Sequence, residues 1–186
     1  MFALNMRVRD HILNDFKPLS TGERVADIML AMEELKCSHL PVLHEGAYLG
    51  LISEDDLLDI QNDQDTLEKH LKVIKPYKVQ ADTHIYEAIQ VIGEGNLTCL
   101  PVIDEQGQYI GYVSPQELMW DLGRQVSYAE RGGVVVLRLP VRDYHISQIA
   151  QIVESEDALI LGLQLRSQAN DFINVALKIN QQDLSR

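Results

Sequence analysis

Ser53 and Ser114 each have a carboxylate three positions later in the chain. Asp56 follows Ser53, and Glu117 follows Ser114. A serine at a helix start offers its hydroxyl beside free backbone N–H groups, which suits a phosphate, and the carboxylate can accept two hydroxyls of a ligand. The same spacing is typical of a capping box, in which both side chains satisfy the helix itself. Both interpretations remain open; Pro115 favours capping in the second pair, so Asp56 is the stronger candidate.

The segments that carry these pairs are copies of each other. Residues 25–29 align with 85–89 and residues 40–42 with 100–102, at an offset of 60, and Gly50 aligns with Gly111 at an offset of 61. A repeated unit of this length buries its apolar face against its twin. Clefts between packed units are common sites for small ligands, so the repeat predicts where a ligand would bind.

Each copy has the same predicted order of elements. Apolar residues from Val25 to Leu35 follow helical spacing, and Ile85 to Ile92 repeat the pattern. Short strands follow at 40–43 and 100–103, then at 48–52 and 109–113, and a helix follows each serine. With the short first strand before each helix, the order is strand, helix, strand, strand, helix.

A third unit is expected after a polar linker at 124–131. It has a strand at 134–139, a helix with Ile146, Ile149 and Ile152 on one face, and strands at 158–165 and 172–179. Residues 180–186 resemble the start of another helix. Three strands and one helix leave a sheet face uncovered, exposing residues such as Val136, Ile160 and Val175. We therefore expect this unit to be incomplete, or to be completed by a second copy.

Composition narrows the classes of partner. The chain has 186 residues and a formal net charge of −12, which disfavours nucleic acid and anionic membrane surfaces. No apolar run is long enough to span a membrane, and the first ten residues do not resemble a signal peptide. We expect a cytoplasmic protein in which Cys37 and Cys99 are reduced, buried thiols.

Catalytic constellations are missing from the sequence. The six histidines lack metal-ligand spacing, and neither a glycine-rich phosphate loop nor a nucleophile elbow is present. Asp55 and Asp56 are adjacent, so on a helix they point to different faces rather than forming a metal pair. The sequence predicts a protein that is not an enzyme and has no metal site.

The residues 40–42 and 50–56, and their copies at 100–102 and 111–117, resemble a tandem pair of CBS domains, at 6–62 and 66–123. The segment 132–186 resembles part of an ACT domain, and the whole is similar to the CBS–CBS–ACT regulatory proteins of the acetoin-utilisation type. This resemblance implies an α/β fold, a CBS pair with a C-terminal ferredoxin-like βαββ segment. It also implies a non-catalytic, usually dimeric sensor of adenine nucleotides or related adenosyl compounds.

The resemblance also nominates ligand contacts. It implies ribose contacts at Asp56 and Glu117, beside Ser53 and Ser114. It adds residues at the first strand of each repeat (Thr21, Thr83 and His84) and two residues that would border the base (His39 and Cys99). The full set is Ser53, Asp56, Thr83, His84, Thr21, His39, Cys99, Ser114 and Glu117.

Charge bears on the ligand. Glu54, Asp55 and Asp59 surround Asp56 and oppose a triphosphate at the helix start, although Lys72, Lys75 and Lys78 could compensate. Among AMP, ATP and S-adenosylmethionine we therefore expect AMP, an adenosine moiety or S-adenosylmethionine rather than ATP.

Two expectations concern assembly. In the ACT-like unit, Tyr144 stands where amino-acid-binding relatives have glycine and Ile146 where they have leucine, which favours a dimerisation role. Apolar residues that one CBS pair cannot cover predict a homodimer; these are Leu57, Leu58, Leu118 and Trp120. The alternative to a ligand sensor is a scaffold with empty clefts that recruits a protein partner, and the regulated protein is unknown.

Overall fold

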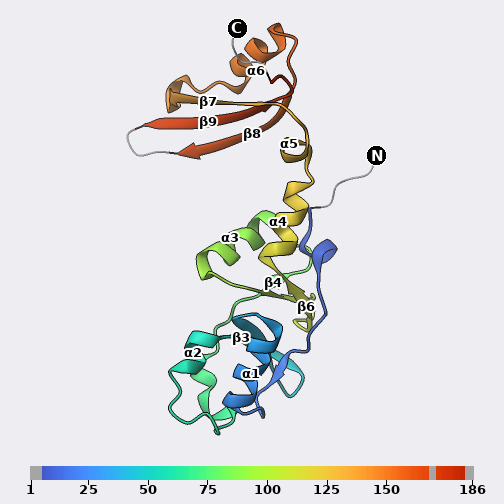
Figure 1. The fold of residues 1–186 in the computed structure, drawn as a ribbon, viewed down its shortest axis with the longest axis vertical. Helices are drawn as coiled ribbons and strands as arrows, with labels where there is room; N and C mark the ends of the chain where they lie inside the picture. Colours follow the sequence, from blue (N-terminus) through green and yellow to red (C-terminus); the bar gives the residue numbers. More distant parts are fainter. Residues whose placement is uncertain (1–5, 168–170, 183–186) are drawn as a thin grey trace. The chain divides into compact units, whose positions relative to one another are not determined.

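The structure is a computed structural model that describes residues 6–167 and 171–182. It is a mixed α/β fold that divides into two compact units, Met1–Met119 and Trp120–Arg186. Each unit is considered by itself (Figure 1).

The first unit contains both sequence repeats, and the predicted order of elements is confirmed. The first repeat consists of β1 (Leu19–Ser20), α1 (Val25–Leu35), β2 (His39–His44), β3 (Ala47–Ser53) and α2 (Glu54–Leu58). The second consists of β4 (Val79–Gln80), α3 (Ile85–Gly95), β5 (Leu100–Ile103), β6 (Tyr109–Val113) and α4 (Pro115–Gly123). In each sheet the middle strand pairs parallel with the first strand and antiparallel with the third.

The apolar periodicity explains the core of each repeat. Val25, Ile28 and Met32 lie one helical turn apart on α1 and are almost completely buried. Leu57 and Leu118 are each only 1% exposed, so the expectation that they contribute to a dimer surface is wrong. They belong to the core because the helix after each serine packs this side chain inward, whereas Leu58 is 62% exposed.

Two short 3-10 helices, η1 (Val8–His11) and η2 (Leu67–Val73), were not predicted. The backbone N–H of Val8 donates to Thr83, at the start of the second repeat, over 3.0 Å, while Leu67 donates to Glu23 of the first repeat over 2.9 Å. The segment before the first repeat therefore packs on the second repeat (dark blue in Figure 1), and the segment between the repeats packs on the first.

The second unit is a three-stranded antiparallel sheet with one longer helix. Its elements are α5 (Val126–Ala129), β7 (Gly133–Pro140), η3 (Val141–Asp143), α6 (Ile146–Ser155), β8 (Ile160–Ser167) and β9 (Phe172–Ile179), with strand order β7-β9-β8. The core joins Ile149 of α6 to Val175 and Leu177 of β9, and Tyr144 packs against it.

Two expectations about the second unit need correction. The stretch 124–131 is not only a linker, because α5 packs on β8 and the Tyr128 hydroxyl accepts a hydrogen bond from Gln164. Val175 is fully buried and Ile160 packs against the core, so of the three residues expected on a bare face only Val136 is exposed, at 65%. Val136 alternates with Leu137, which pairs with Val175, and so lies on the opposite face. Residues 183–186 of the expected second helix lie outside the described residues.

Candidate functional site

Ser53 and Asp56 occupy the junction where β3 runs directly into α2. Ser53 has extended backbone angles, and its hydroxyl accepts a hydrogen bond from the N–H of Asp56 over 3.2 Å. The same hydroxyl donates to the Asp56 carboxylate. Ser114 repeats the cap in the second repeat, since its Oγ accepts from the N–H of Glu117 over 3.1 Å. Both serines therefore cap their helices, whatever else they bind.

Lys75 approaches Asp56 from the segment between the repeats. Its Nζ lies 2.8 Å from Asp56 Oδ2 and 3.1 Å from Oδ1. The backbone of Lys75 exchanges two hydrogen bonds of 2.8 Å with Leu51, beside Gly50. A Cβ at Gly50 would lie 2.6 Å from both the Lys75 carbonyl oxygen and Ile74 Cγ2, so glycine is needed for this close approach.

His39 lies at the same end of the first sheet, because it pairs directly with Ser53 in the β2–β3 ladder. Its Nδ1 is 3.1 Å from Thr98 Oγ1, and the Cys99 thiol donates to its carbonyl oxygen over 3.3 Å. His39 thus connects the two repeats. We call Ser53, Asp56, Lys75 and His39 the first site.

The charges at the first site influence one another. Partial burial alone would raise the pKa of Asp56, but hydrogen bonds from Lys75 and Ser53 outweigh it and the pKa lies below its ordinary value. The hydrogen bond to Asp56 raises the pKa of Lys75. Burial, reinforced by the charge of Lys75, lowers the pKa of His39. Near neutral pH the site therefore holds a carboxylate, an ammonium group and a neutral imidazole.

The equivalent position in the second repeat, which we call the second site, comprises Ser114, Glu117 and His11. Here Leu13 exchanges backbone hydrogen bonds with Tyr112, as Lys75 does with Leu51. Gly111 provides the close approach, since a Cβ there would lie 2.4 Å from Ile12 Cγ2 and its φ is +139°. Leu13 thus occupies the place of Lys75, and the contact of Glu117 is His11, with 3.9 Å between Nδ1 and Oε1. The two sites share a backbone frame but differ in charge.

Four nominated residues do not belong to these two sites. The Thr21 hydroxyl is hydrogen-bonded to His44 Nδ1 over 2.8 Å. His44 ends β2, whereas His39 begins it. Five residues of strand, about 17 Å, separate these two ends. Thr83 and His84 lie beside η1: Thr83 accepts from Val8, and His84 caps α3 and bridges to Arg7. Cys99 is buried between the repeats, where burial raises the pKa of its thiol.

Lys75 is the residue that the nomination missed. The three lysines before β4 were the only indication in the sequence that a cation could reach Asp56, but lysines in such a segment usually lie on the solvent-exposed surface. Only the pairing of Lys75 with Leu51, 24 positions away, brings it to Asp56.

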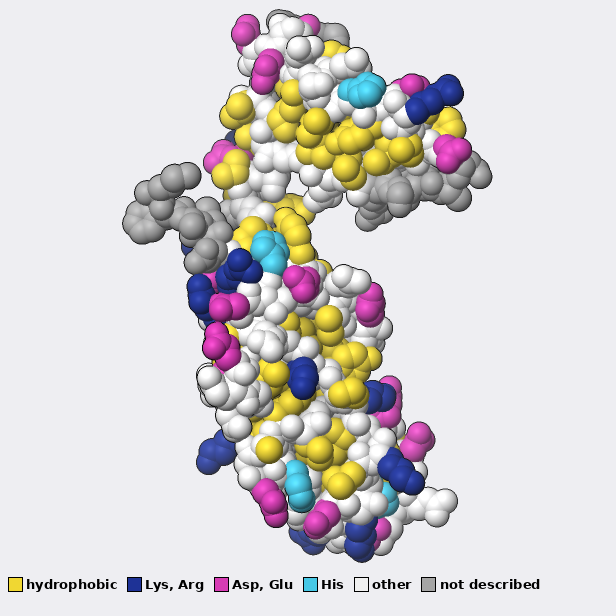
Figure 2. Space-filling model, turned by 180° about the vertical axis from the view of Figure 1, so that it is seen from behind, with side chains coloured by type: hydrophobic (Ala, Val, Ile, Leu, Met, Phe, Trp, Pro, Cys, Tyr) yellow, Lys and Arg dark blue, Asp and Glu magenta, His cyan; other side chains and the backbone are white. Residues whose placement is uncertain are grey.

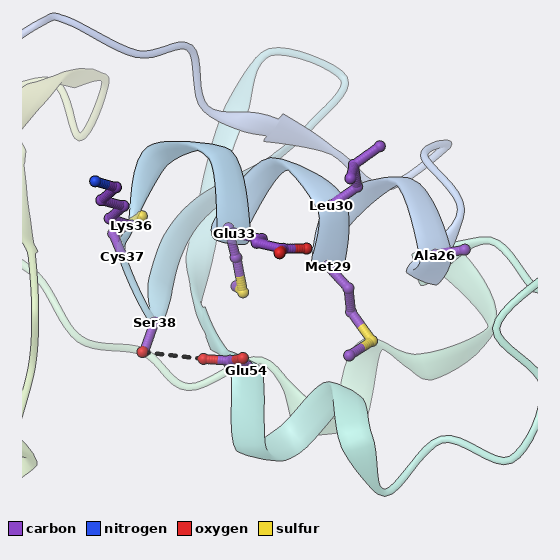
Figure 3. A pocket seen from close by; sticks show the side chains of 9 residues that line it. Ala26, Met29, Leu30, Glu33, Lys36, Cys37, Ser38 and Glu54 are labelled. Atoms are coloured by element: carbon purple, nitrogen blue, oxygen red, sulfur yellow. Dashed lines mark hydrogen bonds between the residues drawn. The ribbon is translucent and has the colours of Figure 1, made fainter.

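A separate cavity of about 590 Å³ lies between α1 and α2 (Figure 3). Met29 points from α1 toward α2 there, and Ser38 donates to Glu54 across one side over 3.0 Å. Among the described residues, no group of three or more histidine, cysteine, aspartate or glutamate side chains could hold a metal ion. No helix of that part of the chain could cross a membrane.

The model of the CBS domain family matches residues 8–63 and 70–123. A protein of Thermofilum pendens, described as an uncharacterized 33.4 kDa protein in the ribosomal RNA operon, is 27% identical over 137 aligned positions, and the match covers 61% of this chain and 45% of that protein. The chain spans less than half the length of the curated relatives it matches.

Solved structures agree in fold. A CBS domain pair/ACT domain protein from Thermotoga maritima is 22% identical with a TM-score of 0.56, over 63% of this chain and 96% of that one. CBSX2 in complex with AMP is 22% identical with a TM-score of 0.51, over 62% of this chain and 95% of that one. The family model ends at residue 123, so the ACT-like assignment of 132–186 stays a prediction. The two family matches account for both sequence repeats and both sites, and the chain belongs to the CBS domain family as a tandem pair.

Proposed function

We propose that the chain is a non-catalytic, cytoplasmic regulatory module that binds an adenosyl ligand with an anionic group at the first site. The observation that carries this proposal is the Lys75–Asp56 pair beside Gly50. A ribose diol would take the oxygens of Asp56 in place of Lys75. The ammonium group, whose side chain is 52% exposed, would then be available to a phosphate.

The same geometry favours AMP over S-adenosylmethionine. A ligand that displaces Lys75 from Asp56 leaves an uncompensated ammonium group, which an anion stabilises and a sulfonium repels. AMP carries that anion with fewer charges than ATP to place near Glu54 and Asp55, which are exposed at the start of α2. The AMP complex of the structural relative CBSX2 supports the ligand class.

Calorimetric titration of the purified chain with AMP, ATP and S-adenosylmethionine tests this proposal. Lys75→Gln should weaken AMP binding about 10- to 150-fold, corresponding to a lost charged hydrogen bond of about 1.5–3 kcal/mol. Lys78→Gln is the matched control, because Lys78 is an exposed lysine three positions away. Equal AMP affinity in both variants would show that Lys75 does not contact the ligand. If none of the three ligands binds, the proposal that the chain senses an adenosyl compound is wrong.

A second candidate function is a scaffold that recruits a protein partner through the CBS pair without a ligand. It is favoured by the fact that Asp56 already accepts hydrogen bonds from Ser53 and Lys75. The calorimetric result separates the two candidates, since a scaffold predicts no heat with any adenosyl compound.

We also propose that the chain is a homodimer. Leu30, Leu58 and Met119 are 55%, 62% and 66% exposed on the helices of the repeats. Leu30 and Met29 border the cavity between α1 and α2. Twofold pairing is the commonest way to cover such a surface. Light scattering should give twice the chain mass of 21.1 kDa, and a concentration-independent monomer mass would contradict the proposal.

A further inference from the structure

The side chain of His39, in the first repeat, is held by the second repeat. The backbone N–H of Thr98 lies 3.3 Å from His39 Nδ1, and the Thr98 hydroxyl oxygen lies 3.1 Å from the same atom. Leu97 and Cys99, on either side of Thr98, are 3% and 1% exposed, so burial of its neighbours fixes the position of Thr98. The Cys99 thiol also donates to the carbonyl oxygen of His39. The ring and the backbone of His39 are therefore both anchored.

These contacts determine the tautomer of the His39 ring. A backbone N–H can only donate, so Nδ1 is the acceptor, and the Thr98 hydroxyl donates to it as well. In a neutral imidazole whose Nδ1 accepts, the proton is on Nε2. Protonation of both nitrogens would set an N–H against the Thr98 N–H. Burial and the charge of Lys75 disfavour it too, since they lower the pKa of His39. The ring is thus a neutral donor at Nε2.

The Nε2–H group of His39 is accessible to a ligand. Among the described residues, none forms a hydrogen bond with Nε2. In that part of the chain the Tyr109 hydroxyl is the one buried side-chain nitrogen or oxygen without a partner, so Nε2 is open to solvent. Histidine side chains reach the surface at several places (cyan in Figure 2), so access alone does not distinguish His39. Its fixed tautomer does, together with its place opposite Ser53 in the β2–β3 ladder.

We propose that the Nε2–H of His39 donates a hydrogen bond to an unprotonated ring nitrogen of the adenine base bound at the first site. This inference rests on the proposed function, in which Asp56 takes the ribose and Lys75 the phosphate. The base is the remaining part of the ligand, and its ring nitrogens N1, N3 and N7 are acceptors. An uncharged donor suits them, because it does not compete with Lys75 for the phosphate. His39 is then a specificity-determining residue for the base.

Calorimetric titration with AMP and its deaza analogues tests this contact. In each analogue one ring nitrogen (N1, N3 or N7) is replaced by C–H, which cannot accept. We expect one analogue to bind the parent chain about 2- to 12-fold more weakly than AMP, as for one lost neutral hydrogen bond. In His39→Phe that analogue and AMP should bind equally. His44→Phe is the matched control and should keep the difference, because His44 ends β2 and is likewise bonded through Nδ1 to a threonine hydroxyl.

Nitrogen NMR of the histidine rings in the parent chain measures the tautomer independently, and the spectrum of His39→Phe identifies the His39 resonances by their loss. We expect the proton on Nε2; a proton on Nδ1 would overturn the inference. Equal affinities for AMP and all three analogues, or a difference that persists in His39→Phe, would also overturn it while leaving the adenosyl sensor standing. Absence of AMP binding to the parent chain would reject the proposed function and this contact together.

Discussion

At the residue scale, Asp56 accepts hydrogen bonds from two side chains that come from different parts of the chain. Ser53 belongs to the same strand-to-helix junction, whereas Lys75 arrives 19 residues later. The cap depends on the serine hydroxyl, and the charge of the site depends on the carboxylate. These two roles can be separated by changing the carboxylate alone.

Asp56→Asn should weaken AMP binding about 10- to 150-fold, because a charged acceptor worth about 1.5–3 kcal/mol is lost. Its melting temperature should change little, since Asn keeps an acceptor for Ser53 and the pair with the half-exposed Lys75 is weak in water. Calorimetry and thermal melting measure the two effects. Asp55→Asn has the same charge change on an exposed neighbour, and equal AMP affinities in both variants would contradict the role given to Asp56.

His39 predicts a pH dependence of stability. Burial and Lys75 lower its pKa below the ordinary 6.5, so the unfolded chain takes up a proton at a higher pH than the folded chain. This contribution to stability is present above about pH 6.5 and is lost as the pH falls toward the lower folded pKa. His39→Gln should flatten the decrease of melting temperature over that range. An identical slope in the parent and the variant would show that His39 is not the group involved.

At the scale of elements, two glycines determine where the site residues lie, because each allows another segment of the chain to pack closely against its strand. Gly50 permits Ile74 and Lys75 to pass against β3, and Gly111 permits Ile12 and Leu13 to pass against β6. Neither contact is between segments adjacent in the sequence. The position of Lys75 therefore depends on a backbone contact as well as on its own side chain.

Gly50→Ala should destabilise the fold by about 1–3 kcal/mol, because the added Cβ meets backbone and must displace the segment at Lys75. AMP binding should weaken as well. Gly93→Ala is the control: it lies in α3 with nothing within 4 Å of the added Cβ, and it should stabilise the helix by up to about 1 kcal/mol. Urea titration measures both variants, and a neutral Gly50→Ala would contradict the close approach.

Sequence patterns predicted the regular elements of both units because their apolar residues repeat with helical or strand spacing. They did not predict η1 or η2, which are short and take their positions from the opposite repeat. They also did not predict α5, which lies in the stretch expected to be a linker, or the short η3. Of the residues nominated for a ligand, Ser53, Asp56 and His39 lie together because of strand pairing, but Thr21 and Thr83 lie at the other ends of their sheets. Strand direction and register, which spacing alone does not give, decide these positions.

At the scale of the whole first unit, each repeat is completed by a segment that lies outside it. Val8 of η1 is fully buried on the second repeat, and Leu67 of η2 is fully buried on the first. Their contacts are related by the same symmetry as the repeats. A substitution at Val8 should therefore destabilise the second repeat, and a substitution at Leu67 should destabilise the first.

Val8→Ala should cost about 2 kcal/mol through lost burial and a residual cavity. Hydrogen exchange should rise in residues 81–85 of the second repeat, since Val8 and Arg9 bond that segment. Leu67→Ala should cost about 2–5 kcal/mol and raise exchange in residues 21–25 of the first repeat. Exchange that rises equally in both repeats for both variants would show that the unit opens only as a whole.

The packing of η1 on the second repeat and of η2 on the first also affects how the chain folds during translation and how its gene can recombine. As the chain leaves the ribosome, Val8 cannot make its contact until Thr83 has been added, and such a long closure slows folding. A gene fragment that encoded only residues 15–62 would lack η2 and its packing on the first repeat. Although the unit consists of two copies of one motif, recombination can move it intact only when both copies travel with the segment before the first copy and the segment between the two.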